Sequence, residues 1–197
     1  MISLHWNTDQ YLSAKLYSVI IWLMEEPLES RIGKLLLARG LKLVVAESCT
    51  GGLLGHLITN VPGCSEYFLG GITAYSYEAK QLLLGVKPQT LIQFGAVSRE
   101  TVLEMAQGVR RVFASHGKEE NVIGVSISGI AGPGGAQPGK PVGLVWIGLS
   151  TAEGDWAADF YGLGNREENK AFSARCALEI IHAYLDGSLK VGKQGET

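Results

Sequence analysis

The sequence has 197 residues, which is enough for one well-buried domain and too few for two ordinary domains without a visible linker. Its 17 basic and 19 acidic residues give a formal net charge of −2, and lysine and arginine form no dense cluster, so nucleic acid is not an expected partner. The cysteines, Cys49, Cys64 and Cys176, form neither a CxxC pair nor an even framework. This usage favours reduced thiols in a cytoplasmic protein.

The first predicted element is a helix over residues 8–24 that ends before Pro27. Its apolar part, residues 19–24, is flanked by charged residues and is too short to cross a bilayer. It also lacks the basic start and the cleavage site of a signal peptide. We therefore predict no membrane partner, and we interpret residues 1–26 as an extra helix that packs on the core or on a second copy in a homo-oligomer.

Helices and strands alternate over the next part of the chain. A helix predicted over residues 28–39 has apolar side chains at spacings of three and four, and Gly40 follows it as a left-handed C′ residue. The apolar run 41–45 predicts a buried strand, which a sharp turn joins to a helix over 52–59. The aromatic and β-branched run 67–75 predicts a second strand.

The alternation continues to the last helix. Ser76 and Ser98 are predicted N-caps of a short and a longer helix, the latter ending at Gly117, with a loop through Pro88 between them. The remaining predicted elements are strands over 121–128, 142–150 and 156–161, a helix from 165 to about 185, and a polar tail over 187–197. Residues 27–186 therefore predict a layered α/β/α domain with a mixed, mostly parallel central sheet, in which the last two strands add an antiparallel edge.

Ser48, in the turn after the first strand, has two interpretations. It can be a helix N-cap, which is the usual role of a serine at such a position. It can also be a nucleophile, because Gly51 and Gly52 would let a ligand approach backbone N–H groups able to hold an oxyanion or a phosphate. His56 is not its base, since eight residues of helix rise by about 12 Å.

Lys80 is the leading candidate for the base, because a lysine buried among apolar groups can lose its proton near neutral pH. Tyr75 and Tyr77 could donate to such a pair or orient it. Cys49 is a rival nucleophile, since a thiol near a helix N-terminus has a lowered pKa. Each residue also has an ordinary interpretation: a solvated lysine, core or rim tyrosines, and an inert buried thiol.

The glycine-rich loop over residues 129–141 does not fit a known nucleotide motif. Residues 134–140 match Gly-x-x-x-x-Gly-Lys, but Pro141 replaces the required Ser or Thr, and Gln137 breaks the dinucleotide fingerprint. Its N–H groups and Lys140 suit a phosphate or ribose contact; the alternative is a merely tight connection. No His, Cys, Asp or Glu cluster has metal-ligand spacing, so neither a metal nor another cofactor is predicted.

Several specific stretches occur together and in fixed order: residues 46–52, 61–65 with 68–75, 78–80 with 84–86, 95–98, 128–135 with 140–143, and 164–167. With these stretches the sequence resembles the CinA C-terminal domain family, which includes the stand-alone nicotinamide-nucleotide amidases. The resemblance covers about residues 28–185. It implies hydrolysis of the carboxamide of nicotinamide mononucleotide to nicotinate mononucleotide and ammonia without a metal, so a small pyridine nucleotide is the expected ligand.

The resemblance places the family's serine, lysine and tyrosine motifs on Ser48, Lys80 and Tyr75. Tyr77 stands where an asparagine is expected, and Ala136 where a glycine is expected. Our hypothesis is acyl transfer through Ser48, with Lys80 as base and Tyr75 assisting. The expected substrate-binding residues are Thr50, Gly51 and Gly52 at the oxyanion, and Gly132, Gly134, Gly135 and Arg166 at the phosphate.

Two alternatives remain. The first is a non-catalytic nucleotide-binding or assembly module of the same fold, which Tyr77 and Ala136 favour. The second is a general amidase or esterase that acts on other small substrates.

Overall fold

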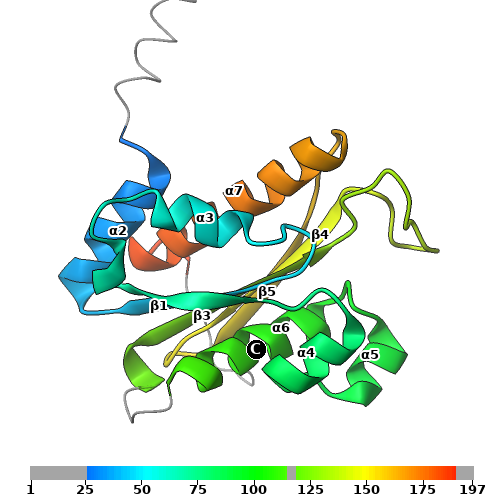
Figure 1. The fold of residues 1–197 in the computed structure, drawn as a ribbon, viewed down its shortest axis with the longest axis horizontal. Coiled ribbons are helices and arrows are strands. Elements are labelled where there is room, and N and C mark those ends of the chain that lie inside the picture. Colours follow the sequence, from blue (N-terminus) through cyan, green and yellow to red (C-terminus); the bar gives the residue numbers. More distant parts are fainter. Residues whose placement is uncertain (1–25, 115–118, 190–197) are drawn as a thin grey trace, which may run out of the picture.

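A five-stranded sheet lies between two layers of helices in the computed structural model, which describes residues 26–114 and 119–189 (Figure 1). The predicted helix over 8–24 lies outside these residues. The strands are β1 (Lys42–Glu47), β2 (Phe68–Thr73), β3 (Val122–Gly129), β4 (Leu144–Ser150) and β5 (Asp155–Tyr161). The helices are α2 (Leu28–Arg39), α3 (Leu53–Thr59), α4 (Tyr77–Leu84), α5 (Pro88–Phe94), α6 (Arg99–Phe113) and α7 (Arg166–Leu185), with 3₁₀ turns η1 (Cys64–Glu66) and η2 (Glu119–Asn121).

The sheet is mixed, as predicted. Its order is β2-β1-β3-β4-β5. The first three strands in this order pair in parallel, whereas β4 is antiparallel to β3 and β5 is antiparallel to β4. The prediction of a layered α/β/α domain with an antiparallel edge is therefore confirmed.

Helices α2, α3 and α7 cover one face of the sheet, and α4, α5 and α6 cover the other (Figure 1). Strand β1 contributes to both cores: Leu43 packs in the cluster with α2, α3 and α7, and Val44 packs in the cluster with α4 and α6. A strand that is buried on both faces has no polar face. This explains why residues 43–46 of β1 form a continuous apolar run and do not alternate with polar residues.

Three of the predicted helix ends agree with the structure, whereas α6 ends at Phe113 and not at Gly117. Gly40 has a left-handed φ of 64°, and the hydroxyls of Ser76 and Ser98 accept N–H bonds from the first turns of α4 and α6. The predicted loop through Pro88 is wrong, because Pro88 is the first residue of helix α5. A proline at this position loses no helical hydrogen bond and already has a helical φ.

No helix within residues 26–114 and 119–189 is long and apolar enough to span a membrane.

Candidate active site

The carboxyl ends of the parallel strands form a crevice between the two helical layers. Strand β1 is the central one of the three, with β2 on one side and β3 on the other. The chain leaves β1 through α3 on one face of the sheet and leaves β2 through α4 on the opposite face (Figure 1). Connections that diverge in this way open a crevice at the strand ends, which is where ligands bind in open α/β sheets.

Ser48 lies at the end of β1 and is held by the sheet. Its N–H donates to the carbonyl of Ile127 at 3.0 Å, which extends the pairing of β1 with β3 by one residue. On the other side, the carbonyl of Glu47 accepts the N–H of Ala74 at 2.9 Å. The Ser48 hydroxyl therefore projects from a backbone that two neighbouring strands fix.

Lys80 reaches Ser48 from helix α4. The side chain is fully buried, and its Nζ lies 3.0 Å from Ser48 Oγ, 2.7 Å from the carbonyl oxygen of Ala74 and 3.1 Å from that of Tyr75. Ser76, the residue after Tyr75, caps α4. Lys80 is the fourth residue of this helix, and its side chain reaches back to the carbonyls of Ala74 and Tyr75. Residues 32 positions apart in sequence are thus brought into hydrogen-bond contact.

Burial acts in opposite directions on the two titratable groups beside Ser48. It disfavours the ammonium form and lowers the pKa of Lys80 from 10.5 to about 8. It also disfavours the thiolate and raises the pKa of Cys49 to about 11. The expectation of a lowered pKa for Cys49 is wrong, because the effect of burial on the thiol is the largest one, and α3 begins only at Leu53. The raised pKa of the Cys49 thiol favours Ser48 over Cys49 as the nucleophile.

The N-terminus of α3 differs from the prediction. Its N-cap is Gly52, not Ser48, and the Glu47 carboxylate accepts the N–H groups of Gly52, Leu54 and Gly55 at 3.0, 3.1 and 2.8 Å. The N-cap interpretation of Ser48 is thus wrong.

The predicted ring of free N–H groups in the turn is also partly filled. The N–H of Gly52 is bound by Glu47, and the N–H of Gly51 donates to the Ser48 carbonyl. Within the described residues, the N–H groups of Cys49 and Thr50 donate to no backbone carbonyl. Both interact with the Cys49 thiol and lower its pKa against the larger effect of burial. The Thr50 side chain is buried, and its hydroxyl has no hydrogen-bond partner among the described residues. Gly51 and Gly52 are therefore removed as oxyanion donors, and Cys49 and Thr50 remain.

A cavity of about 250 Å³ opens above Ser48 and Lys80. Its polar lining includes Tyr75, Ser128 and Arg166, and its lining contains two basic side chains, Lys80 and Arg166, and no carboxylate. The remaining lining residues are Cys49, Ala96, Val97, Gly129, Ile130, Ala131, Gly132, Gly134 and Gly135. The structure thus brings Ser48, Lys80, Tyr75, Arg166 and the three predicted loop glycines to one cavity.

Arg166 connects the two sides of this cavity. Its guanidinium donates to the carbonyl of Gly132 at 2.7 Å and to the hydroxyl of Tyr75 at 3.2 Å. Behind it, the Asn169 amide donates to the carbonyl of Ala131 at 3.0 Å. Arg166 begins α7, so this helix holds the glycine-rich loop in place. The Tyr75 side chain is 61% exposed and faces Arg166, while its backbone carbonyl contacts Lys80.

The residues that depart from the family pattern lie outside the cavity lining. The Tyr77 hydroxyl accepts the N–H of Ala96, a residue of the lining, at 3.3 Å, and Ala136 is exposed. Lys140 also lies outside the lining, and its amine donates to the carbonyl of Phe94.

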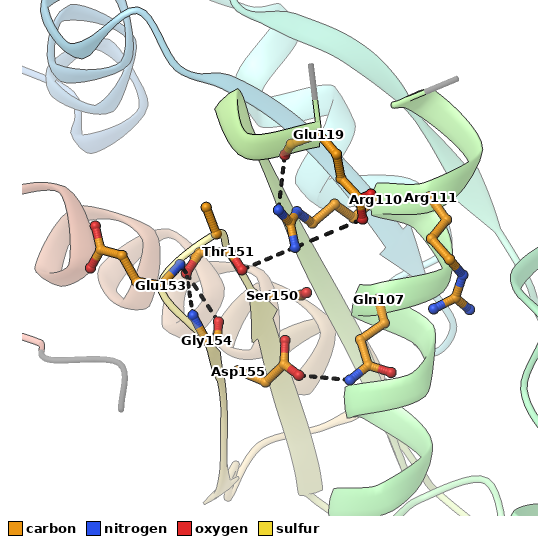
Figure 2. A pocket seen from close by; sticks show the side chains of 10 residues that line it. Gln107, Arg110, Arg111, Glu119, Ser150, Thr151, Glu153, Gly154 and Asp155 are labelled. Carbon is orange, nitrogen blue, oxygen red and sulfur yellow. Dashed lines mark hydrogen bonds and ion pairs between the residues drawn. The ribbon is translucent and has the colours of Figure 1, made fainter. Parts of the chain in front are cut away.

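A second cavity, of about 260 Å³, lies at the opposite ends of the strands (Figure 2). Arg110 dominates it, but its guanidinium already donates to the carbonyls of Val122, Thr151 and Glu119. We therefore assign Arg110 a structural role: it links the start of β3, the turn after β4 and η2 through their carbonyls. Neither cavity contains a metal site: the described residues include no group of three metal-ligating side chains.

Two residues that hold the site were missed in the sequence. The position of Glu47 could have indicated its role, because a carboxylate is stabilised near a helix N-terminus. Asn169 offers no such signal, since it lies inside α7 and contacts the loop only through the tertiary fold.

Known proteins place the chain in a family. The sequence profile of the CinA C-terminal domain matches residues 25–185. The chain belongs to the CinA C-terminal domain family. A putative competence-damage inducible protein of Desulforamulus reducens is 39% identical over 181 residues, covering 92% of this chain and 42% of that protein. One of Moorella thermoacetica is 47% identical over 166 residues, covering 80% of this chain and 36% of that protein. The chain thus spans less than half the length of these relatives.

Solved structures of the CinA superfamily have the same fold. A superfamily protein of Klebsiella pneumoniae has a TM-score of 0.74 and 31% identity, with 81% of this chain and 96% of that one covered. The competence/damage inducible protein of Agrobacterium tumefaciens has a TM-score of 0.70 and 34% identity, with 83% of this chain and 98% of that one covered. In contrast to the longer relatives, these chains are covered almost completely.

Proposed function

We propose that the protein is an amidohydrolase of the CinA family that converts nicotinamide mononucleotide to nicotinate mononucleotide and ammonia. The observation that carries the proposal is the contact of 3.0 Å between the Ser48 hydroxyl and the buried amine of Lys80 at the floor of the cavity. A nucleophile and a base within hydrogen-bond reach are the signature of covalent catalysis.

The carbonyls around Lys80 prepare its amine to act as a base. A neutral amine has two N–H donors and one lone pair. The carbonyls of Ala74 and Tyr75 accept the two hydrogens, which directs the lone pair toward Ser48. The lowered pKa of Lys80 makes the neutral amine available near pH 8.

The reaction then follows as two displacements. Ser48 Oγ bonds to the carboxamide carbon while its proton moves to Lys80 Nζ, and the carbonyl oxygen becomes an oxyanion that the N–H groups of Cys49 and Thr50 can stabilise. The carbon–nitrogen bond breaks as the Lys80 ammonium returns the proton to the departing nitrogen, which leaves as ammonia. Water next attacks the acyl ester carbon while Lys80 takes one of its protons. The bond between this carbon and Ser48 Oγ then breaks as the Lys80 ammonium returns the proton to Ser48 Oγ, and the acid product loses its remaining proton to solvent as the carboxylate.

The charge of the cavity supports an anionic substrate. Arg166 lies at its rim, and no carboxylate lines it. We assign the substrate phosphate to Arg166 and to the N–H groups of Gly134 and Gly135, and the pyridine ring to the apolar wall that includes Val97 and Ile130. Tyr75 orients Arg166 through its hydroxyl.

Ammonia release from nicotinamide mononucleotide tests the proposal. Ser48→Ala and Lys80→Met are each expected to lower kcat at least about 10³-fold, because they remove the nucleophile and the base. Ser126→Ala is the matched control: Ser126 is a buried serine of β3, but it bonds to Val102 and lies outside the cavity. Full activity of the folded Ser48→Ala protein would end the assignment of the nucleophile.

Binding and a substrate panel separate the alternatives. Calorimetric binding of the mononucleotide to the wild type, without ammonia release, would favour a non-catalytic module. Faster turnover of nicotinamide or simple esters than of the phosphorylated substrate would favour a general amidase or esterase. We expect neither result, and Arg166→Ala should raise KM for the mononucleotide more than for nicotinamide.

A further inference from the structure

Glu47 is a buried acid that the proposed reaction does not use. Its side chain is 2% exposed, and it precedes Ser48 directly. The carboxylate forms hydrogen bonds with three backbone N–H groups of the α3 N-terminus and no salt bridge with a described residue. A buried carboxylate is strongly destabilising unless such donors compensate it. The start of α3 supplies both the N–H groups and the positive end of the helix dipole.

These bonds close the turn that carries Ser48. The backbone carbonyl of Glu47 is fixed in the sheet by the N–H of Ala74, while its side chain holds the N–H of Gly52. The same residue therefore binds both ends of the segment 48–51. The width of the turn depends on the length of the Glu47 side chain, and the direction of the Ser48 hydroxyl depends on the width of the turn.

Given the proposed function, we infer that Glu47 is a positioning residue that holds Ser48 against Lys80. It acts through the backbone of the turn, without contact with the substrate. Its carboxylate also occupies the N–H groups of α3 from within the protein.

Glu47→Gln and Glu47→Asp test the inference. A glutamine has one acceptor oxygen and one NH₂ group, so at least one of the three N–H groups then meets another donor. An aspartate is one methylene shorter and cannot span all three donors. We expect kcat for ammonia release to fall about 10- to 100-fold in both variants while KM changes less than about threefold, because the nucleophile is displaced.

Two further measurements separate positioning from a general loss of stability. Labelling of Ser48 by a serine-reactive fluorophosphonate should slow by a similar factor in the Glu47 variants. Ile58→Val, a core substitution on the same helix, should lower the melting temperature without changing kcat or the labelling rate. A crystal structure of Glu47→Gln should show Ser48 Oγ moved away from Lys80 Nζ.

The possible outcomes are distinct. Unchanged kcat and labelling in the folded Glu47 variants, or an unchanged turn in the crystal structure, would overturn the role of Glu47 and leave the proposed function intact. If Glu47→Gln does not fold, the kcat and the labelling rate of Glu47→Asp, which keeps the charge, test the role of Glu47. A wild-type protein that is neither labelled at Ser48 nor able to release ammonia would overturn the proposed function and this inference together.

Discussion

Lys80 occupies an environment that a lysine adopts only when its neighbours compensate for burial. Three oxygen atoms surround its amine, yet desolvation still lowers its pKa from 10.5 to about 8. Its position beside a serine hydroxyl makes this lowered pKa relevant to function, since a base is most effective when its pKa lies near the working pH.

The pH dependence of activity should report this lysine. Because the proposed base acts as the neutral amine, kcat/KM should rise with pH and level off above about pH 8. Ammonia release measured from pH 6 to pH 10 at saturating and low substrate gives the profile. A profile that is flat from pH 6 to pH 9, or that falls in this range, would contradict Lys80 as the base.

Lys80 should also make stability depend on pH. Its pKa is lower in the folded chain than the ordinary 10.5 of the unfolded chain, so between about pH 8 and 10.5 the unfolded chain binds more protons. The free energy of unfolding contributed by this group therefore rises with pH in that window. Urea unfolding at several pH values gives the free energy of unfolding of the wild type and of Lys80→Met. The difference between their slopes against pH isolates the effect of Lys80, because the other groups contribute equally to both. Equal slopes would contradict the lowered pKa.

Cys49 should be unreactive despite its position next to Ser48. Its thiol is 7% exposed, and its pKa of about 11 leaves roughly one part in 10³ as thiolate at pH 8. We expect iodoacetamide at pH 8 to modify the more exposed Cys64 well before Cys49. Mass spectrometry of digested samples measures both sites. Faster modification of Cys49 would restore it as a rival nucleophile.

At the scale of elements, helix α6 can approach α4 closely because Gly108 has no side chain. A Cβ at this position would lie 1.9 Å from the carbonyl oxygen of Leu84, the last residue of α4. Helix α4 carries Lys80, which strands β1 and β2 place beside Ser48. The packing of α6 against α4 therefore helps to fix the position of Lys80. Helix propensity alone would favour alanine over glycine at position 108.

Gly108→Ala and Gly55→Ala should therefore have opposite effects. The former should lower the free energy of unfolding by about 2 kcal/mol or more, because the new methyl group meets a backbone carbonyl. The latter should raise it by about 0.5 kcal/mol, because the nearest atom, Glu47 Oε1, lies 3.5 Å away and alanine favours the helix. Urea unfolding of both variants tests this; a stabilising Gly108→Ala would contradict the close approach.

At the scale of the whole molecule, we propose that residues 27–186 are the folding unit and that residues 1–26 contribute to a homo-oligomer. The apolar run 19–24 motivates this prediction. A chain shortened to residues 27–186 should unfold cooperatively and release ammonia, and light scattering should show a smaller number of subunits than in the full chain. An unchanged number of subunits would remove the N-terminal segment from the interface.

Local chemistry determines much of this fold in the sequence itself. The periodicity of residues 28–39, the caps at Ser76 and Ser98 and the C′ glycine at Gly40 depend only on near neighbours, and they were predicted correctly. Alternating strands and helices likewise determine the layered architecture, because parallel strands need crossover helices. Ser48 and Lys80 were likewise identified from short stretches, the turn after the first strand and the helix that Ser76 caps, and the family motifs fall on the same two residues.

Tertiary structure alone decided how these groups meet. The end of β1 is surrounded by side chains from α4, α7 and the loop after β3, and a one-dimensional sequence does not show which of its N–H groups are already occupied. Two of the three N–H groups predicted for the oxyanion are already bound, that of Gly52 by Glu47 and that of Gly51 by the Ser48 carbonyl, and burial raises the pKa of Cys49 where a helix terminus was expected to lower it. Desolvation and hydrogen bonding depend on the distances between atoms in space, which only the packed chain establishes.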